Sequence, residues 1–258
     1  MTVKVVLLAG GLGTRLREET EYKPKPMVEI GGKPVLWHLM KYFATFYLSE
    51  FVVCTGYRGE VIKDYFLNYQ ALNSDFTVHL GTPGHIEYCT APTECDWSVT
   101  VADTGANTMT GGRVKRVRRH LDGRFMVAYG DGISDIDLAK LIAFHDSHGK
   151  LATITTVRPS SRFGVVDLDE DGRVQRFREK PRGDGHVNVG YFVFEPEVLE
   201  YLDEDCVLER GPLERLAAHG ELMAYQHEGF WQPMDTYREF LMLNELWDSS
   251  NAPWKVWH

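Results

Sequence analysis

A glycine-rich segment at residues 8–16 (LAGGLGTRL) has residue types suited to binding phosphate. It follows an apolar run at 3–8, as a loop follows a buried strand. Glycines let backbone N–H groups approach a phosphate closely, and Thr14 and Arg15 add further donors. The segment is no Walker loop, and the pattern GxGxxG would need glycine where Leu16 stands. A plain strand-to-helix turn is the alternative.

The segment Lys23-Pro24-Lys25-Pro26 adds two cations shortly after this loop. A proline restricts the residue before it to extended backbone, so we expect both lysine side chains to be held outward. Arg15, Lys23 and Lys25 could then gather positive charge. For the KPKP segment alone a solvated turn is equally good, but the neighbouring glycine loop favours phosphate binding.

Two carboxylates occupy positions suited to a hard cation. Asp131 follows the apolar run RFMVAY, and Asp235 precedes a segment with helical periodicity. In phosphate sites Mg²⁺ is usually held by one or two carboxylates together with phosphate oxygens. A turn role is the alternative for Asp131 and a helix N-cap for Asp235, and Asp135 or Asp137 could serve instead. The residues alone leave the choice of pair open.

The predicted secondary structure around these residues alternates between strand and helix. Predicted strands lie at 3–8, 51–55, 124–129 and 151–157, and predicted helices begin near 34, 61, 112 and 136. This order implies a mainly parallel sheet covered by helices on both faces. Later the chain predicts a hairpin around 169–172, a strand at 187–194 and a helix at 235–247. We expect a single domain over 1–258, with halves at about 1–157 and 158–258.

Composition excludes several classes of protein. The chain has 258 residues, 28 Lys plus Arg and 37 Asp plus Glu, hence a formal charge of −9 and no overall attraction to nucleic acid or anionic lipid. No apolar run approaches the ~20 residues that span a bilayer, and the N-terminus lacks a signal-peptide pattern. The four cysteines (Cys54, Cys89, Cys95, Cys206) show no CxxC spacing. The sequence predicts a cytoplasmic protein that binds neither nucleic acid nor membrane.

The segments GGLGTRL and KPKPM together resemble the signature of the sugar-phosphate nucleotidylyltransferases. Further segments are similar to the glucose-1-phosphate cytidylyltransferase (CDP-glucose pyrophosphorylase) branch of that family: VEIGGKPVLWHLM, DTGANTMTGGRVKRV, AYGDGISD, FHDSHGKLAT and GFWQPMDT. The resemblance runs from residue 3 to about 257. It implies a Rossmann-like nucleotidyltransferase fold, a mixed and mainly parallel sheet flanked by helices, with a smaller mixed α/β portion that binds sugar. The implied reaction converts CTP and α-D-glucose 1-phosphate to CDP-glucose and pyrophosphate, with Mg²⁺ as cofactor.

The resemblance also implies a role for each candidate residue. Arg15 would hold the β- and γ-phosphates, Lys25 would bridge the α-phosphate and the sugar phosphate, and Asp131 and Asp235 would bind Mg²⁺. The implied nucleotide-binding residues are Leu8, Ala9, Gly10, Gly11, Leu12, Gly13, Thr14, Thr108, Arg113 and Gly130. For Arg113 a solvated basic helix face is the alternative. The sugar phosphate is itself ionised, so no general base is required, and the ten histidines, which contain no HxxxH pair, are expected to be structural.

Glu179, Lys180 and Asn188 are the implied sugar-phosphate ligands, with an exposed ion pair as the alternative for the first two. The chain departs from the family pattern at Val189, where glycine is usual, and at Leu208, where tryptophan is usual. A bulkier residue could narrow the sugar pocket, so another sugar phosphate or another pyrimidine triphosphate is the second hypothesis. A binding module without catalysis is the third. The resemblance further implies a homo-oligomer, a hexamer in described cases.

Overall fold

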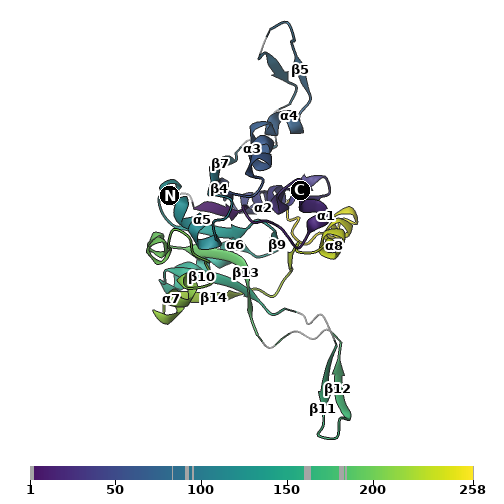
Figure 1. Cartoon of the computed structure of the whole chain (residues 1–258), viewed down its shortest axis with the longest axis vertical. Helices are drawn as coiled ribbons and strands as arrows, with labels where there is room; N and C mark the ends of the chain where they lie inside the picture. Colours follow the sequence, from purple (N-terminus) through teal and green to yellow (C-terminus); the bar gives the residue numbers. More distant parts are fainter. Residues whose placement is uncertain are drawn as a thin grey trace.

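A seven-stranded sheet forms the centre of the computed structural model, which describes residues 3–82, 84–90, 93–94, 96–159, 164–179, 183 and 185–257. The strand order is β14-β10-β13-β8-β1-β4-β7, and helices lie on both sides of the sheet (Figure 1). The strands are β1 (Lys4–Leu8), β4 (Glu50–Thr55), β7 (Ser98–Asp103), β8 (Phe125–Tyr129), β10 (Ala152–Val157), β13 (Val187–Phe194) and β14 (Leu222–Gln226). The predicted α/β fold with a mixed sheet is confirmed.

The pairing of the strands is mostly parallel. β1 pairs in parallel with β4 and β8, as do β4 with β7 and β10 with β14, whereas β13 runs antiparallel between β8 and β10. The carboxyl ends of β1 and β8 therefore meet at one edge of the sheet, and the amino end of β13 reaches the same edge. Loops that leave this edge are the ones that can build a common site.

Apolar side chains fill two cores, one on each face of the sheet. Side chains alternate along a strand, so Val5 and Leu7 of β1 belong to one core and Val6 and Leu8 to the other. The first core receives α2 (Val35–Ala44), α6 (Leu138–His148) and α8 (Tyr237–Asp248); the second receives α5 (Thr110–Arg116), η3 (Pro196–Tyr201) and α7 (Pro212–Ala218). The C-terminal tail joins the first core through Trp254, which is fully buried.

Several predicted elements have different ends from those expected. The helix predicted from residue 61 is two helices, α3 (Gly59–Leu67) and α4 (Tyr69–Asn73), and the basic helix predicted from 112 is α5 followed by the 3₁₀ turn η2 (Arg118–His120). Other short elements are α1 (Arg17–Thr20), η1 (Lys25–Met27), β2 (Glu29–Ile30), β3 (Lys33–Pro34), β9 (Gly132–Ser134) and β15 (Trp231–Pro233). Within the described ranges, no helix is both long and apolar enough to span a bilayer.

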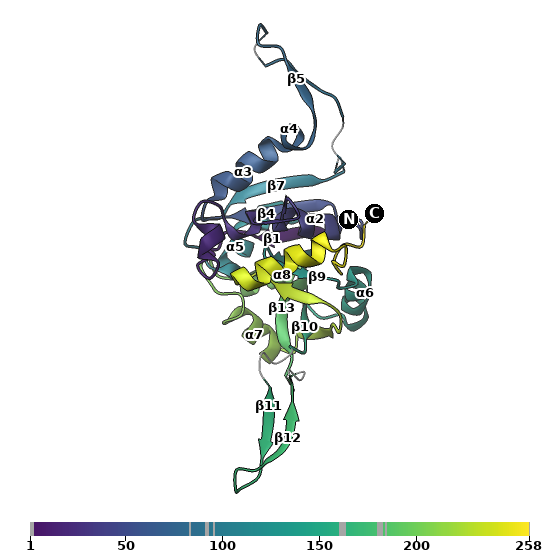
Figure 2. The same ribbon diagram turned by 90° about the vertical axis from the view of Figure 1, so that its right-hand side faces the viewer.

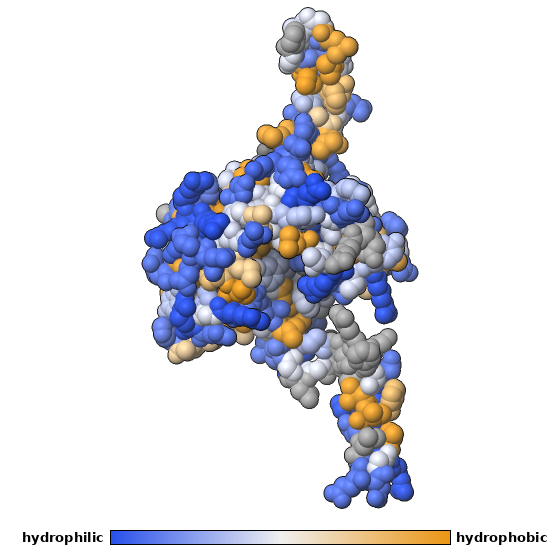
Figure 3. All heavy atoms as spheres, in the orientation of Figure 1, coloured by the Kyte–Doolittle hydropathy of each residue, from blue (hydrophilic) through white to orange (hydrophobic). Residues whose placement is uncertain are grey.

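Two antiparallel hairpins project from opposite ends of the body, as Figures 1 and 2 show. One is formed by β5 (Phe76–Val78) and β6 (Ile86–Tyr88), and the other by β11 (Val165–Leu168) and β12 (Val174–Arg178), which confirms the hairpin predicted around 169–172. We call them the upper arm and the lower arm. Both carry exposed apolar side chains, which appear as orange patches in Figure 3.

Candidate active site

A cavity of about 700 Å³ opens at the sheet edge where β1 and β8 end. It is lined by fourteen of the predicted site residues: Leu8, Gly10, Gly11, Leu12, Gly13, Thr14, Arg15, Lys25, Thr108, Arg113, Gly130, Asp131, Asn188 and Asp235. We call it the main cavity. The fold thus brings together residues from segments that are far apart in the sequence.

Among the predicted site residues that the structure describes, two do not line this cavity. Ala9 is buried, and its backbone N–H donates to the carbonyl oxygen of Cys54 in the neighbouring strand. Glu179 follows β12 at the base of the lower arm. Lys180 lies outside the described residues.

The guanidinium of Arg113 holds the glycine loop against the sheet. It is 4% exposed, and its nitrogens donate to the carbonyl oxygens of Gly10 at 2.9 Å, Thr55 at 3.0 Å and Gly105 at 2.9 Å. A Cβ atom at Gly10 would overlap this guanidinium, so a larger residue at position 10 would displace Arg113 from these hydrogen bonds. Burial lowers the pKa of Arg113 from its ordinary value. The alternative interpretation of Arg113 as part of a solvated helix face is therefore wrong.

Lys25 places its ammonium group between the two candidate metal carboxylates. Its nitrogen lies 2.5 Å from Asp131 Oδ2 and 2.5 Å from Asp235 Oδ1, while the residue as a whole is only 7% exposed. The expectation of extended backbone at Lys25 is wrong, because Lys25 begins the 3₁₀ turn η1. Pro24 lies at the N-cap of this turn, and Pro26 is its second residue, where no backbone N–H donor is needed.

The two carboxylates meet because short strands lie beside each of them. β9 follows Asp131, β15 precedes Asp235, and the two strands pair antiparallel with Gly132 opposite Pro233. The backbone N–H of Met234 donates to the carbonyl oxygen of Asp131 at 2.9 Å. Asp131 and Asp235 thereby face the same lysine, although β13, α7 and β14 lie between them in the chain.

The helix cap and the two competing aspartates are accounted for elsewhere in the structure. Thr236, not Asp235, caps α8, because its hydroxyl accepts from the Glu239 N–H in a capping box. Asp137 caps α6 by accepting from the Lys140 N–H. Asp135 accepts from the Phe230 N–H at 2.6 Å and lies 2.9 Å from His227. Both competitors are thus engaged away from Lys25.

The other predicted cations behave differently from Lys25. Arg15 is exposed, and its Nη1 lies 2.7 Å from Asp235 Oδ2 at the mouth of the main cavity. Lys23 lies 3.9 Å from Glu29 and does not line the cavity. The expected cluster of three cations is therefore wrong: Arg15 and Lys25 converge, and Lys23 does not.

The Asp131 and Asp235 carboxylates fit a hard divalent cation. A cationic nitrogen already contacts oxygens of both, so one cation can reach the pair. In the part of the chain that the structure describes, no third His, Cys, Asp or Glu joins them closely enough to complete a cage of protein ligands. Such an incomplete set suits Mg²⁺, which keeps several water ligands and binds substrate phosphates alongside one or two carboxylates.

A second cavity of about 530 Å³ adjoins the first and was missed by sequence reasoning. It shares Trp231, Pro233 and Asp235 with the main cavity and is lined further by Arg158, His186, Gln226, His227 and Glu239. Several of these polar residues lie at or just beyond the ends of β10 and β14, a position that could have indicated them. We call this the side cavity.

The two departures from the family pattern have different surroundings. Val189 is 2% exposed, belongs to the first core and also lines the main cavity, where its carbonyl oxygen accepts from the Trp231 indole N–H. Leu208 is fully buried in the second core and lines neither cavity. Only Val189 can therefore affect the shape of the site directly.

Comparison with known proteins decides the family. The sequence profile of the Nucleotidyl transferase family matches residues 4–235, which is most of the chain. The chain belongs to the nucleotidyl transferase family. Members of this family typically use a divalent metal. The chain is 50% identical to a glucose-1-phosphate cytidylyltransferase from Salmonella typhi and 41% identical to a probable glucose-1-phosphate cytidylyltransferase from Bacillus subtilis. Each match covers 99% of this chain and all of the relative.

Solved structures support the fold. A UDP-glucose pyrophosphorylase in complex with UDP-glucose superposes with a TM-score of 0.70 at 16% identity, covering 97% of this chain and 100% of that chain. HddC from Yersinia pseudotuberculosis superposes with a TM-score of 0.69 at 24% identity, covering 95% of this chain and 100% of that chain. At these identities the likeness shows a shared fold.

Proposed function

We propose that this nucleotidyl transferase catalyses the Mg²⁺-dependent transfer of a cytidylyl group from CTP to α-D-glucose 1-phosphate. A phosphate oxygen of the sugar phosphate attacks the α-phosphorus of CTP, the bond from that phosphorus to the β-phosphate bridging oxygen breaks, and pyrophosphate leaves. The products are CDP-glucose and pyrophosphate. The full-length identity of 50% to a glucose-1-phosphate cytidylyltransferase supports this choice of nucleotide and sugar.

The observation that carries the proposal is the position of the Lys25 ammonium group. It contacts both Asp131 and Asp235 in a cavity that the glycine loop also lines. Two anions must meet in this reaction, so the site must first neutralise charge, and positioning and electrostatics then supply most of the rate. A protein that only bound nucleotide sugars would not need the pair of metal carboxylates.

Lys25 and Arg15 are the proposed catalytic residues. Lys25 lines the main cavity, while Asp235 beside it lines both cavities. The lysine thus stands near the junction of the two spaces, where it can bridge the α-phosphate and the sugar phosphate. Arg15, exposed at the mouth, can bind the β- and γ-phosphates bidentately and stabilise the departing pyrophosphate.

The nucleotide is proposed to lie along the glycine loop. Backbone groups of Leu8 to Thr14 would contact the base, ribose and phosphates, with Gly130 allowing close approach beside the metal carboxylate. Thr108 and Arg113 would support the opposite wall. The Thr108 hydroxyl already accepts from Arg116 at 2.7 Å, and Arg113 is committed to backbone carbonyls. We therefore assign Arg113 the task of positioning the loop.

Mg²⁺ would be held by Asp131 and Asp235 and would supply charge neutralisation at the phosphates. Its binding requires the Lys25 ammonium to share these carboxylates or to turn toward the phosphates, and the ammonium borders the open cavity. Both carboxylates retain partial exposure, 28% for Asp131 and 16% for Asp235, so a hydrated cation can reach them.

The sugar phosphate is proposed to occupy the side cavity and the adjoining part of the main cavity. Asn188 lines the main cavity, and its side-chain oxygen accepts from the Gly190 N–H at 2.9 Å, which fixes the orientation of the amide. Glu179, at the base of the lower arm, and Lys180, which lies outside the described residues, remain predicted ligands of the sugar phosphate. Polar groups of the side cavity, among them His186 and Glu239, would then form hydrogen bonds with the sugar hydroxyls.

A competition assay tests the proposal. Purified protein receives Mg²⁺, equimolar CTP, UTP, dTTP and ATP, and α-D-glucose 1-phosphate, and nucleotide products are identified by mass spectrometry. We expect CDP-glucose as the dominant product and no product when EDTA replaces Mg²⁺. A dominant product with another base would contradict the CTP assignment, and no nucleotide sugar with any triphosphate would overturn the glucose assignment.

Another sugar 1-phosphate, or another pyrimidine triphosphate, is the second candidate, and Val189 in the wall of the main cavity favours it. A panel of sugar 1-phosphates with CTP distinguishes the two. Turnover of glucose 1-phosphate alone would remove the alternative sugar, whereas turnover only with a different sugar would establish it. The competition assay tests the alternative triphosphate.

Assembly as a homo-oligomer, a hexamer by family resemblance, is part of the proposal, and the exposed apolar side chains of both arms support it. The cytoplasmic location and the single-domain organisation stay predictions.

A further inference from the structure

A second set of metal-binding side chains lies on the upper arm, well away from the active site. The arm extends from the body beyond α3 and α4, on the far side of β7 from β1 (Figures 1 and 2). Its hairpin carries His79, His85 and Glu87, and all three side chains are exposed. Nothing in the transfer reaction uses these residues.

The register of the hairpin places the three side chains on one face. Thr77 pairs with Glu87, and the backbone N–H of His79 donates to the His85 carbonyl oxygen at 3.2 Å, which continues the pairing by one step. Side chains alternate along each strand, so His79, His85 and Glu87 share a face, whereas Val78 and Ile86 lie on the other. The spacing H-x₅-H-x-E therefore places the three side chains together on a hairpin, whereas the spacing HxxxH does so on a helix.

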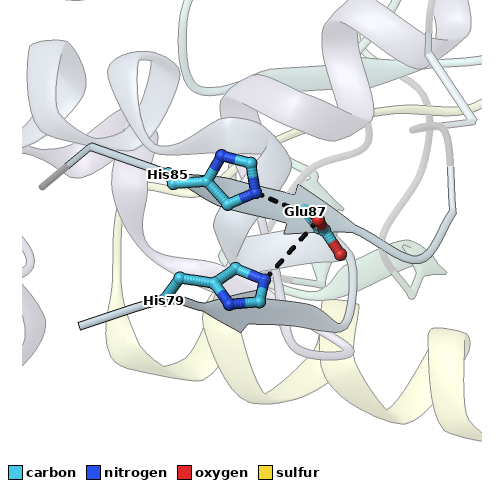
Figure 4. Close-up of side chains that lie close together, drawn as sticks. All are labelled: His79, His85 and Glu87. Carbon is cyan, nitrogen blue, oxygen red and sulfur yellow. Dashed lines mark hydrogen bonds and ion pairs between the residues drawn. The ribbon is translucent and has the colours of Figure 1, made fainter. Parts of the chain in front are cut away.

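The three side chains converge on one point. His85 Nε2 lies 3.0 Å and His79 Nε2 lies 3.5 Å from the same carboxylate oxygen, Glu87 Oε1 (Figure 4). The centroids of the two imidazole rings are 4.7 Å apart. Metal–ligand bonds of 2.0–2.2 Å in a tetrahedron imply donor atoms about 3.3–3.6 Å apart. The ligand atoms all lie within 4.8 Å of one another, so small side-chain rotations would complete the geometry.

We propose that His79, His85 and Glu87 form a binding site for a borderline divalent transition metal, with Zn²⁺ as the expected occupant. Two imidazole nitrogens and one carboxylate oxygen suit Zn²⁺, whereas Mg²⁺ prefers oxygen ligands and a nearly ideal octahedron. Three protein ligands leave a fourth position for water or for a donor from another molecule. The arm site and the Asp131–Asp235 pair thus select different metals.

Metal at this site would fix the end of the arm. The turn between His79 and His85 is held by the Thr82 N–H donating to the His79 carbonyl at 2.9 Å and by the His85 N–H donating to the Thr82 carbonyl at 3.1 Å. An isolated two-stranded hairpin is only marginally stable in water. A metal that bridges its two strands adds a link across the turn, so it would order the arm without touching the active site.

The test is a Zn²⁺ titration by calorimetry on tag-free protein that has been stripped of metal, in excess Mg²⁺ to occupy the Asp131–Asp235 pair. Co²⁺ absorption spectra report whether the coordination is tetrahedral. We expect one Zn²⁺ per chain with wild-type protein, loss of that equivalent in His79→Ala/His85→Ala, and binding weakened by about tenfold or more in Glu87→Gln. CTP turnover should stay unchanged in all of them, which also shows that the variants fold.

His219→Ala is the matched control, since this exposed histidine lies outside the cluster and its Nδ1 lies 3.1 Å from the Tyr201 hydroxyl. It should bind Zn²⁺ like wild type. Unchanged stoichiometry and affinity in the double-alanine variant, or no Zn²⁺ binding by wild-type protein, would overturn the proposal. Because the readout is metal binding, failure here leaves the proposed transferase activity intact.

Discussion

The backbone N–H of Met234 donates a 2.9 Å hydrogen bond to the carbonyl oxygen of Asp131. This bond continues the β9–β15 pairing by one residue on each strand, and it sets the neighbouring Asp235 beside Asp131. The buried Tyr191 hydroxyl supports the same place by donating to the Gly132 carbonyl at 2.9 Å. Burial, and secondarily the charge of Asp131, raise the pKa of Tyr191 well above its ordinary value, so this donor stays protonated.

Replacing either carboxylate should abolish most turnover. We expect Asp131→Asn and Asp235→Asn each to lower kcat/KM by about 10²–10³ or more. Each substitution removes one of the two carboxylate charges that would bind Mg²⁺. Initial rates across a Mg²⁺ titration measure this. Asp137→Asn is the matched control, since asparagine also caps helices well and α6 should remain stable. Near-normal Mg²⁺-dependent activity in Asp131→Asn would refute the assignment.

Lys25→Met should make the thermal stability of the protein depend more strongly on Mg²⁺. Removing the ammonium leaves two carboxylates facing each other, which we expect to cost about 1–3 kcal/mol, less than for a fully buried pair because both are partly exposed. Mg²⁺ should therefore raise the Tm of Lys25→Met more than that of wild type in differential scanning fluorimetry, while activity is lost. Lys23→Met removes a long and partly exposed ion pair with Glu29, so it should change neither. Equal Mg²⁺ shifts in Lys25→Met and wild type would contradict a shared cation position.

Arg113→Met tests the positioning role at the glycine loop. The carbonyl oxygens of Gly10, Thr55 and Gly105 would lose a buried donor, so we expect a stability loss of about 2–4 kcal/mol and a raised KM for CTP. Urea unfolding and steady-state kinetics measure the two effects, and Arg113→Lys should recover part of both. Arg119→Met, at an exposed position, serves as the control. A stability loss with unchanged KM would show that the arginine serves the fold alone.

His38 should make the protein less stable in mild acid. Burial lowers the pKa of His38 to about 4, and the neutral ring fits its two contacts, with Nε2 facing the Ile30 carbonyl at 2.8 Å and Nδ1 facing the Trp254 indole N–H at 3.4 Å. Below its unfolded value near 6.5 the unfolded chain takes up a proton that the folded chain does not. Stability is therefore lost as pH falls from 6.5 to 4, by about 3 kcal/mol from this group.

Urea unfolding at several pH values checks this dependence. His38→Gln keeps a donor for the Ile30 carbonyl and cannot take up the proton, so its stability should fall less steeply between pH 6.5 and 4. His219→Gln, at an exposed position, should keep the wild-type slope. Parallel slopes for His38→Gln and wild type would show that other groups cause the acid sensitivity.

The lower arm should contribute to self-association. Val166 and Phe177 lie directly opposite each other on β11 and β12, and both are exposed. We expect Val166→Ser/Phe177→Ser to shift the protein to smaller species in light scattering, with its circular dichroism unchanged. Leu241→Ser, an exposed residue on α8, should leave the mass unchanged. Identical masses for the arm variant and wild type would exclude this arm as an interface.

The sheet, the glycine loop and most of the residues around the main cavity could be predicted from the sequence. Short apolar runs become strands buried on both faces, and the carboxyl ends of parallel strands share an edge, so local patterns suffice to place the loop beside Asp131. The resemblance then named fourteen residues that do line the main cavity. These features follow from local patterns of residue types, which can be read from the sequence.

The partner that each of these side chains takes depends on the tertiary structure and could not be predicted. Thr236 takes the capping role that could have occupied Asp235, Arg113 turns inward to backbone carbonyls, and Lys23 pairs away from the site. The side cavity and the His79–His85–Glu87 set arise in the same way, from strand ends and from a hairpin register. Such contacts join residues far apart in the chain, or they depend on which of several neighbouring groups forms a given hydrogen bond. Neither the periodicity nor the spacing of residues in the sequence shows which group that is.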